Sequence, residues 1–126
     1  MADLSPIAVL WVTDWYGGPV EGMASFEGRE CWFQAIFDAE ADEWTNPRRC
    51  RLYELSEDER AWRWAEHRRW EELGGGNSCF HDNAPDPALK PGWRAFYQGH
   101  DDRAVRLGRE IGQFTAPPLR RPRQGR

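Results

Sequence analysis

The stretch MASFEGRECWFQAIF, residues 23–37, decides the fold because it has the pattern of two strands joined by a tight turn. Glu27-Gly28 separates two apolar runs, and a glycine there tolerates the positive φ that a short hairpin needs. Residues 30–37 alternate between the two faces of a strand. The face that we expect to point into a core is wholly apolar and consists of Cys31, Phe33, Ala35 and Phe37.

Two further segments, one on each side of this hairpin, favour strands. Residues 7–13, IAVLWVT, are apolar and β-branched, and residues 49–55, RCRLYEL, alternate between apolar and polar side chains. Both patterns are typical of strands, and strands that follow one another along the chain usually pair. We therefore expect a small antiparallel sheet or an SH3-like meander of roughly three to five strands.

The strongest helix signal is residues 56–73, SEDERAWRWAEHRRWEEL. Ser56, with Glu59 three residues later, forms a capping box, and the three glycines at 74–76 end the helix. At about 100° per residue, one helix face gathers four apolar side chains that we expect to cover the sheet. These are Trp62, Ala65, Trp70 and Leu73. The predicted fold class is α+β with one main helix.

The last third of the chain gives weaker signals. Residues 74–92 are rich in Gly, Pro, Asn and Asp and favour a long loop, while residues 93–100 could form a short aromatic helix. Residues 101–114 suit either a second helical segment or a final strand. Residues 115–126, TAPPLRRPRQGR, indicate a flexible basic tail. We therefore expect a single α+β domain over 1–114 with an irregular C-terminal third, followed by the tail 115–126.

Three short elements carry a resemblance to a known group of proteins. They are D-W-Y-G-G-P at 14–19, E-G-x-x-x-W-F at 27–33 and Y-E-L-S at 53–56. Over residues 9–73 the chain resembles small uncharacterised bacterial proteins that have a W-Y/F-x-G-P-x-x-G element followed by a short Y/C-W-F strand. That group has no assigned activity, so the resemblance implies one α+β domain and no catalytic residue.

Charge and cysteine content argue against several classes of protein, although the basic tail and Arg63, Arg68 and Arg69 leave nucleic-acid binding open as an alternative. A net charge of −4 argues against binding to nucleic acid or to anionic membranes, because both require a positive surface. No apolar run approaches the ~20 residues of a membrane span, and no basic region precedes the apolar residues 7–12 as in a signal peptide. Three cysteines do not form a disulfide framework. We expect a cytoplasmic protein that does not enter a membrane.

The glycine-rich element near the N-terminus could form a wall of a ligand pocket. Asp14, Trp15 and Tyr16 precede Gly17-Gly18-Pro19, and aromatic rings beside glycines allow a ligand to approach the backbone closely. The alternative is a structured hairpin whose aromatic side chains fold back on the core. A ligand-binding or hydrolytic protein would have its pocket between residues 14–22 and 74–92.

Metal binding and catalysis have little support in the sequence. Cys79 and His81 lack the paired cysteine spacing of a zinc site, and residues 38–43, DAEADE, lack the glycine of a calcium loop. No nucleophile signature surrounds Cys79 or the serines. We therefore predict no catalytic residue, no metal site and no cofactor.

A protein-binding surface is better supported. Trp64 lies at helical spacing with Arg60, Arg68 and His67, and tryptophan and arginine commonly anchor interfaces. The alternative is that the C-terminal residues Trp93, Phe96 and Tyr97 cover this helix face. Residues 1–60 carry 13 acidic and 5 basic side chains, which suits a basic partner. The favoured function is a small cytoplasmic bacterial domain that holds another protein, as immunity proteins and inhibitors do. The sequence specifies neither the partner's identity nor an oligomeric state.

Overall fold

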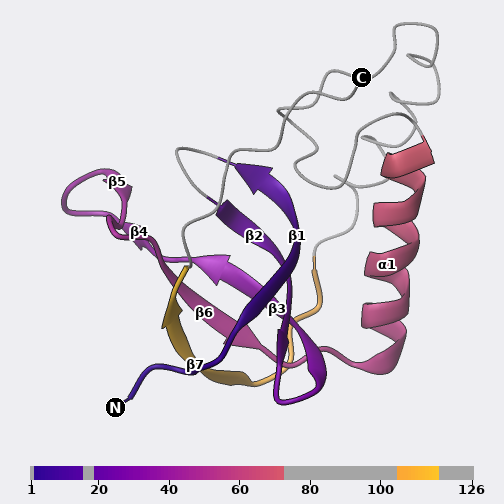
Figure 1. Ribbon diagram of the computed structural model, residues 1–126. Helices are drawn as coiled ribbons and strands as arrows, with labels where there is room; N and C mark the ends of the chain where they lie inside the picture. Colours follow the sequence, from indigo (N-terminus) through magenta and orange to yellow (C-terminus); the bar gives the residue numbers. More distant parts are fainter. Residues whose placement is uncertain (1, 16–18, 73–104, 117–126) are drawn as a thin grey trace, which may run out of the picture.

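The computed structural model of the chain describes residues 2–15, 19–72 and 105–116 (Figure 1). Five strands form one antiparallel sheet in the order β1-β2-β3-β6-β7, two short strands form a separate hairpin, and one helix lies beside the sheet. The predicted α+β class is confirmed. The elements are β1 (Ala8–Trp15), β2 (Pro19–Phe26), β3 (Arg29–Ala35), β4 (Phe37–Asp38), β5 (Glu43–Trp44), β6 (Arg49–Tyr53), α1 (Glu57–Glu72) and β7 (Glu110–Thr115).

The glycine-rich N-terminal element is a long hairpin rather than an open loop. Strand β1 runs to Trp15 and pairs with β2 from Pro19, with irregular register at three points along the ladder. Gly22 faces Val12 across this ladder, and a Cβ there would overlap the backbone carbonyl oxygen of Trp11. The glycine therefore permits the close approach of β1 and β2 that curls the sheet.

The predicted turn between β2 and β3 is confirmed. Phe26 pairs with Arg29, and the two turn residues Glu27 and Gly28 have φ values of 51° and 76°. Two consecutive positive φ angles are the requirement of the two-residue hairpin turn that matches the twist of the flanking strands.

The sequence allowed either a helix or a strand for residues 101–114. The structure forms strand β7 in this region, paired with β6. The N-terminal residues 2–7 lie along the other side of β7, where the Leu4 amide donates to the Gln113 carbonyl at 2.9 Å. Leu4 also packs over Gly112. The residues that precede the first strand thus contact the last strand, so the sheet curls toward a small barrel, as an SH3-like meander requires.

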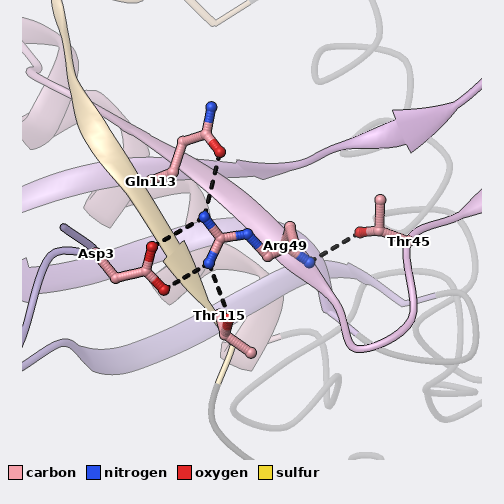
Figure 2. A network of polar contacts seen from close by, with 5 residues as sticks. All are labelled: Asp3, Thr45, Arg49, Gln113 and Thr115. Atoms are coloured by element: carbon pink, nitrogen blue, oxygen red, sulfur yellow. Dashed lines mark hydrogen bonds and ion pairs between the residues drawn. The ribbon is translucent and has the colours of Figure 1, made fainter. Parts of the chain in front are cut away.

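An arginine fixes this closure. Figure 2 shows the Arg49 guanidinium between the N-terminal segment and β7. Arg49 donates to both carboxylate oxygens of Asp3, at 2.6 and 3.0 Å, and also to the side chains of Gln113 and Thr115. This pairing lowers the pKa of the Asp3 carboxyl and raises the pKa of Arg49.

The two faces of the sheet carry different cores. The concave face buries small and aromatic side chains from every strand of the sheet, including Val12, Ala24, Phe33, Cys50, Leu52 and Phe114. The other face buries Trp11, Met23 and Trp32 beneath helix α1 and residues 105–107. The alternation predicted for β3 is confirmed at Cys31 and Phe33, which are buried on the concave side.

Phe37 does not follow that alternation. Strand β3 ends at Ala35, and the amide of Ile36 donates to the Arg49 carbonyl, after which the chain enters the β4–β5 hairpin. Phe37 therefore leaves the core face and is 44% exposed. The expectation that it points inward is wrong because the chain turns away from the sheet before this residue.

Helix α1 begins as predicted but packs on a different face. The Ser56 hydroxyl accepts a hydrogen bond from the Glu59 amide at 3.1 Å, which is the expected cap. Of the four side chains predicted to cover the sheet, Ala65 is exposed and Trp62 is half-buried, while the Trp70 side chain and Leu73 lie outside the described part of the chain. The side chains that α1 buries are instead polar or charged, namely Glu59, Arg63, Glu66 and His67.

The reason for this reversal lies on the sheet. Trp11 and Trp32 present aromatic rings to the helix, and rings accept cationic and imidazole groups on their faces. The Arg63 guanidinium carbon lies 5.2 Å from the centroid of the Trp32 ring, and the His67 ring stacks on Trp11. A polar helix stripe thus has partners that a purely aliphatic sheet would lack.

Candidate interaction surface on helix α1

Trp64 lies at the centre of the candidate surface. Its indole Nε1 donates to Glu30 Oε1 on β3 at 3.0 Å, and its ring meets the buried Trp11 ring edge-on at 5.5 Å. The side chain is half-buried, with one side against the sheet. The hydrogen bond and the ring contact together hold Trp64 in one orientation.

Two arginines flank this tryptophan along α1. Arg60 donates to the same Glu30 oxygen at 3.0 Å, so its charge is largely offset. Arg68 is exposed, and its guanidinium carbon lies 5.7 Å from the centroid of the Trp64 ring. In the part of the chain that the structure describes, Arg68 forms no ion pair. Its charge is therefore available to an incoming group.

A depression of about 400 Å³ lies beside Trp64, between helix α1 and Glu30 of β3. Its lining combines an aromatic ring, two guanidinium groups and one carboxylate with the exposed methyl group of Ala61. The depression is open, so it can take up a side chain of another protein more readily than it can enclose a small molecule. The lining residues are Glu30, Arg60, Ala61, Trp64 and Arg68.

The structure brings together three of the four residues predicted for partner binding. Arg60, Trp64 and Arg68 share the depression, whereas His67 is 2% exposed and lies between the helix and the sheet. Its ring stacks on Trp11 with centroids 4.3 Å apart, and its Nε2 lies 3.4 Å from Glu71 Oε1. His67 therefore supports the surface from behind and does not line it.

Glu30 and Ala61 were missed by the sequence analysis. Glu30 lies two residues before Trp32 and therefore on the same, helix-facing side of β3, which the sequence pattern could have indicated. Its pairing with Trp64, however, spans 34 residues. Ala61 had no signal, because an exposed alanine in a helix is common. The carboxylate matters here because it orients both Arg60 and Trp64.

A buried ion pair lies beneath this surface. Arg63 Nε donates to Glu59 Oε2 at 3.0 Å, and the two side chains are 2% and 1% exposed. The Arg63 guanidinium also lies over the Trp62 and Trp32 rings, at 4.6 and 5.2 Å from their centroids. These contacts attach the first half of α1 to the sheet.

The other predicted ligand residues lie largely outside the described part of the chain. The backbone of Asp14 and Trp15 belongs to β1. Their side chains, Tyr16 and the whole of residues 74–92 lie outside the described part of the chain, as do Cys79, His81 and His100. The predicted C-terminal cover, Trp93, Phe96 and Tyr97, also lies outside it. Of the predicted tail 115–126, Thr115 is instead the last residue of β7 and the Ala116 amide donates to the Arg48 carbonyl at 2.8 Å, while residues 117–126 lie outside the described part.

The described residues give no support to a metal site. Those residues contain no group of three or more His, Cys, Asp or Glu side chains placed to bind a metal ion. Asp38, the first residue of the acidic DAEADE segment, instead accepts hydrogen bonds from the amides of Glu40 and Ala41. Burial raises the pKa of the Cys31 thiol and raises that of Cys50 to about 11, so both remain protonated near neutral pH.

Comparison of the chain with protein-family models, with curated proteins and with solved structures finds no match. Among the helices described, none is long and apolar enough to cross a membrane.

Proposed function

We propose that this chain is a small cytoplasmic bacterial protein-binding domain of the immunity or inhibitor type. Its contact surface is the depression lined by Glu30, Arg60, Ala61, Trp64 and Arg68. The observation that carries the proposal is the arrangement of Trp64, whose indole N–H donates to Glu30 and whose ring lies beneath the Arg68 guanidinium.

The chemistry of this surface favours a protein as the ligand. Tryptophan and arginine dominate the binding energy of protein interfaces, and side chains that are already ordered lose less entropy on binding. Trp64 is ordered by one hydrogen bond and by ring contacts, so its exposed part can pack on a partner at low cost. Arg68 supplies donors for a carboxylate or a backbone carbonyl of the partner.

The test is a comparison of baits in pull-downs from nuclease-treated lysate of the source organism, read by mass spectrometry. Ala61→Gln fills the depression and Arg68→Glu reverses its exposed charge. The matched control is Ala65→Gln, which alters another exposed alanine of α1 that does not line the depression. Trp64 itself is a poor target, because its ring packs on Trp11 and its loss would also weaken the fold.

The proposal expects one stoichiometric protein partner with the unmodified chain and with Ala65→Gln, and loss of that partner with Ala61→Gln and Arg68→Glu at unchanged melting temperature. A partner retained equally by all four baits contradicts the assignment of the surface. A blank with the unmodified chain contradicts the protein-binding class. A melting shift in a metabolite screen would then support the ligand-binding alternative.

A further inference from the structure

The β4–β5 hairpin stands apart from the five-stranded sheet. Its two strands form their own sheet, whose ladder continues in the hydrogen bond from the Thr45 amide to the Ile36 carbonyl, and the Ile36 amide connects it to the larger sheet by donating to the Arg49 carbonyl. Figure 1 shows the hairpin projecting from the five-stranded sheet on the side opposite to α1. It therefore presents a surface separate from the depression around Trp64.

This hairpin carries an aromatic side chain in an unusual position. Within the described ranges Phe37 is the one large hydrophobic side chain that is exposed, at 44%. Its ring meets Trp44 edge-on, with centroids 5.1 Å apart, and the Arg48 guanidinium carbon lies 5.4 Å from the centroid of the Trp44 ring. Phe37 is thus held outward on a fixed support, which is how an anchoring side chain is presented to a partner.

The charges around Phe37 indicate the kind of partner. The segment 37–44, FDAEADEW, contains four carboxylates and no basic residue. Asp38 is occupied by the amides of its own turn, whereas Glu40, Asp42 and Glu43 are exposed. In the described part of the chain, none of these three carboxylates forms an ion pair. Of the nearby arginines, Arg49 is bound to Asp3 and Arg48 lies over Trp44.

We propose that the β4–β5 hairpin is a second contact site, which inserts Phe37 into an apolar pocket on a basic protein surface. The exposed carboxylates of Glu40, Asp42 and Glu43 meet lysine or arginine side chains that surround that pocket. Complementary charge speeds the encounter and selects a basic partner, while the aromatic anchor supplies most of the affinity. The same carboxylates repel the phosphates of nucleic acids, so the partner is a protein.

The experiment uses the full chain, labelled with ¹⁵N, and two peptide probes of equal length. One probe alternates arginine and leucine, and the other alternates glutamate and leucine. The indole N–H signal of Trp44 reports contact at the hairpin, because this ring touches Phe37. The test variants are Phe37→Ser and the double change Glu40→Gln with Glu43→Gln. The control is Asp58→Asn with Glu72→Gln, two exposed acids of α1.

The expected result is a saturable shift of the Trp44 signal with the arginine–leucine probe and no shift with the glutamate–leucine probe. Loss of the anchor or of the two charges should weaken binding by about tenfold or more, whereas the α1 control should stay within about twofold. No shift with the basic probe overturns the proposal. Equal binding by Phe37→Ser also overturns it, because only non-specific charge attraction would remain. Arg68→Glu should bind the probe as the unmodified chain does, so this test can fail independently of the surface on α1.

Discussion

The imidazole of His67 lies flat against the indole of Trp11, with ring centroids 4.3 Å apart and planes inclined by 9°. Both side chains are buried, so the contact joins α1 directly to β1. Trp64 meets the same indole edge-on. The candidate surface on α1 is therefore supported by a contact between two buried side chains.

Replacing His67 with alanine should remove this stack and leave a cavity between helix and sheet. We expect the free energy of unfolding to fall by about 3 kcal/mol, as for other buried rings cut to alanine. His67→Phe keeps a ring over Trp11 and should cost less. Urea denaturation measures both, with the exposed neighbour Arg68→Ala as the control. An effect of His67→Ala no larger than that of the control would contradict the packing of α1.

The buried ion pair gives a second expectation. Glu59→Gln removes the charge that compensates Arg63 in a dry environment, so we expect a loss of about 3 kcal/mol of stability. Glu57→Gln is the matched control, because Glu57 lies in the same helical turn but is exposed. Its cost should be below about 0.5 kcal/mol. Equal costs at the two positions would show that Glu59 and Arg63 are solvated.

Gly22 gives a third expectation. A methyl group there meets the carbonyl oxygen of Trp11 and lies 2.9 Å from Val12 Cα, and backbone atoms cannot move away cheaply. We expect Gly22→Ala to cost about 3 kcal/mol. Gly28→Ala is the comparison, since nothing lies within 4 Å of its added Cβ and only its φ of +76° opposes the change. That variant should cost about 1 kcal/mol. The reverse order of melting temperatures would contradict the β1–β2 ladder.

The Cys50 thiol gives an expectation for alkaline pH. Burial raises its pKa from 9.0 to about 11 in the folded chain. The unfolded chain therefore loses this proton at a lower pH than the folded chain. The free energy of unfolding that the protonated thiol contributes is fully present below pH 9 and is lost as the pH rises toward 11. At pH 10 we expect a loss of about 1.4 kcal/mol relative to pH 7.

The variant Cys50→Ala isolates this contribution, because it retains every other group that titrates in this range. The difference between the two chains in their loss of unfolding free energy from pH 7 to pH 10 is the quantity to measure. Identical losses would mean that the Cys50 thiol is accessible to solvent in the folded state.

Local signals in the sequence were sufficient for much of the fold. Three of these signals depend on residues only a few positions apart, and all three are confirmed. They are the turn at Glu27-Gly28, the cap at Ser56 and the placement of Cys31 and Phe33 on one buried face of β3. Residues 110–115 could not be assigned because their strand exists only through pairing with β6, about 60 residues earlier.

The face of α1 that meets the sheet was predicted wrongly for a related reason. Charged residues at helical spacing usually face solvent, and only the tryptophans of β1 and β3 make burial of Arg63 and His67 favourable. The spacing of Arg60, Trp64 and Arg68 did predict that they share a face, since neighbouring turns of a helix align them. The carboxylate that orients two of them, Glu30, comes from a distant strand.

The measurement that tests the central claim most directly is photo-cross-linking in living cells of the source organism. A benzophenone amino acid replaces Ala61, inside the depression, or Ala65, which lies one helical turn away and is also exposed. If this surface holds another protein, irradiation should yield one discrete cross-linked product from position 61 and little from position 65. No product at position 61, or equal products at both positions, would contradict the proposed function of this surface.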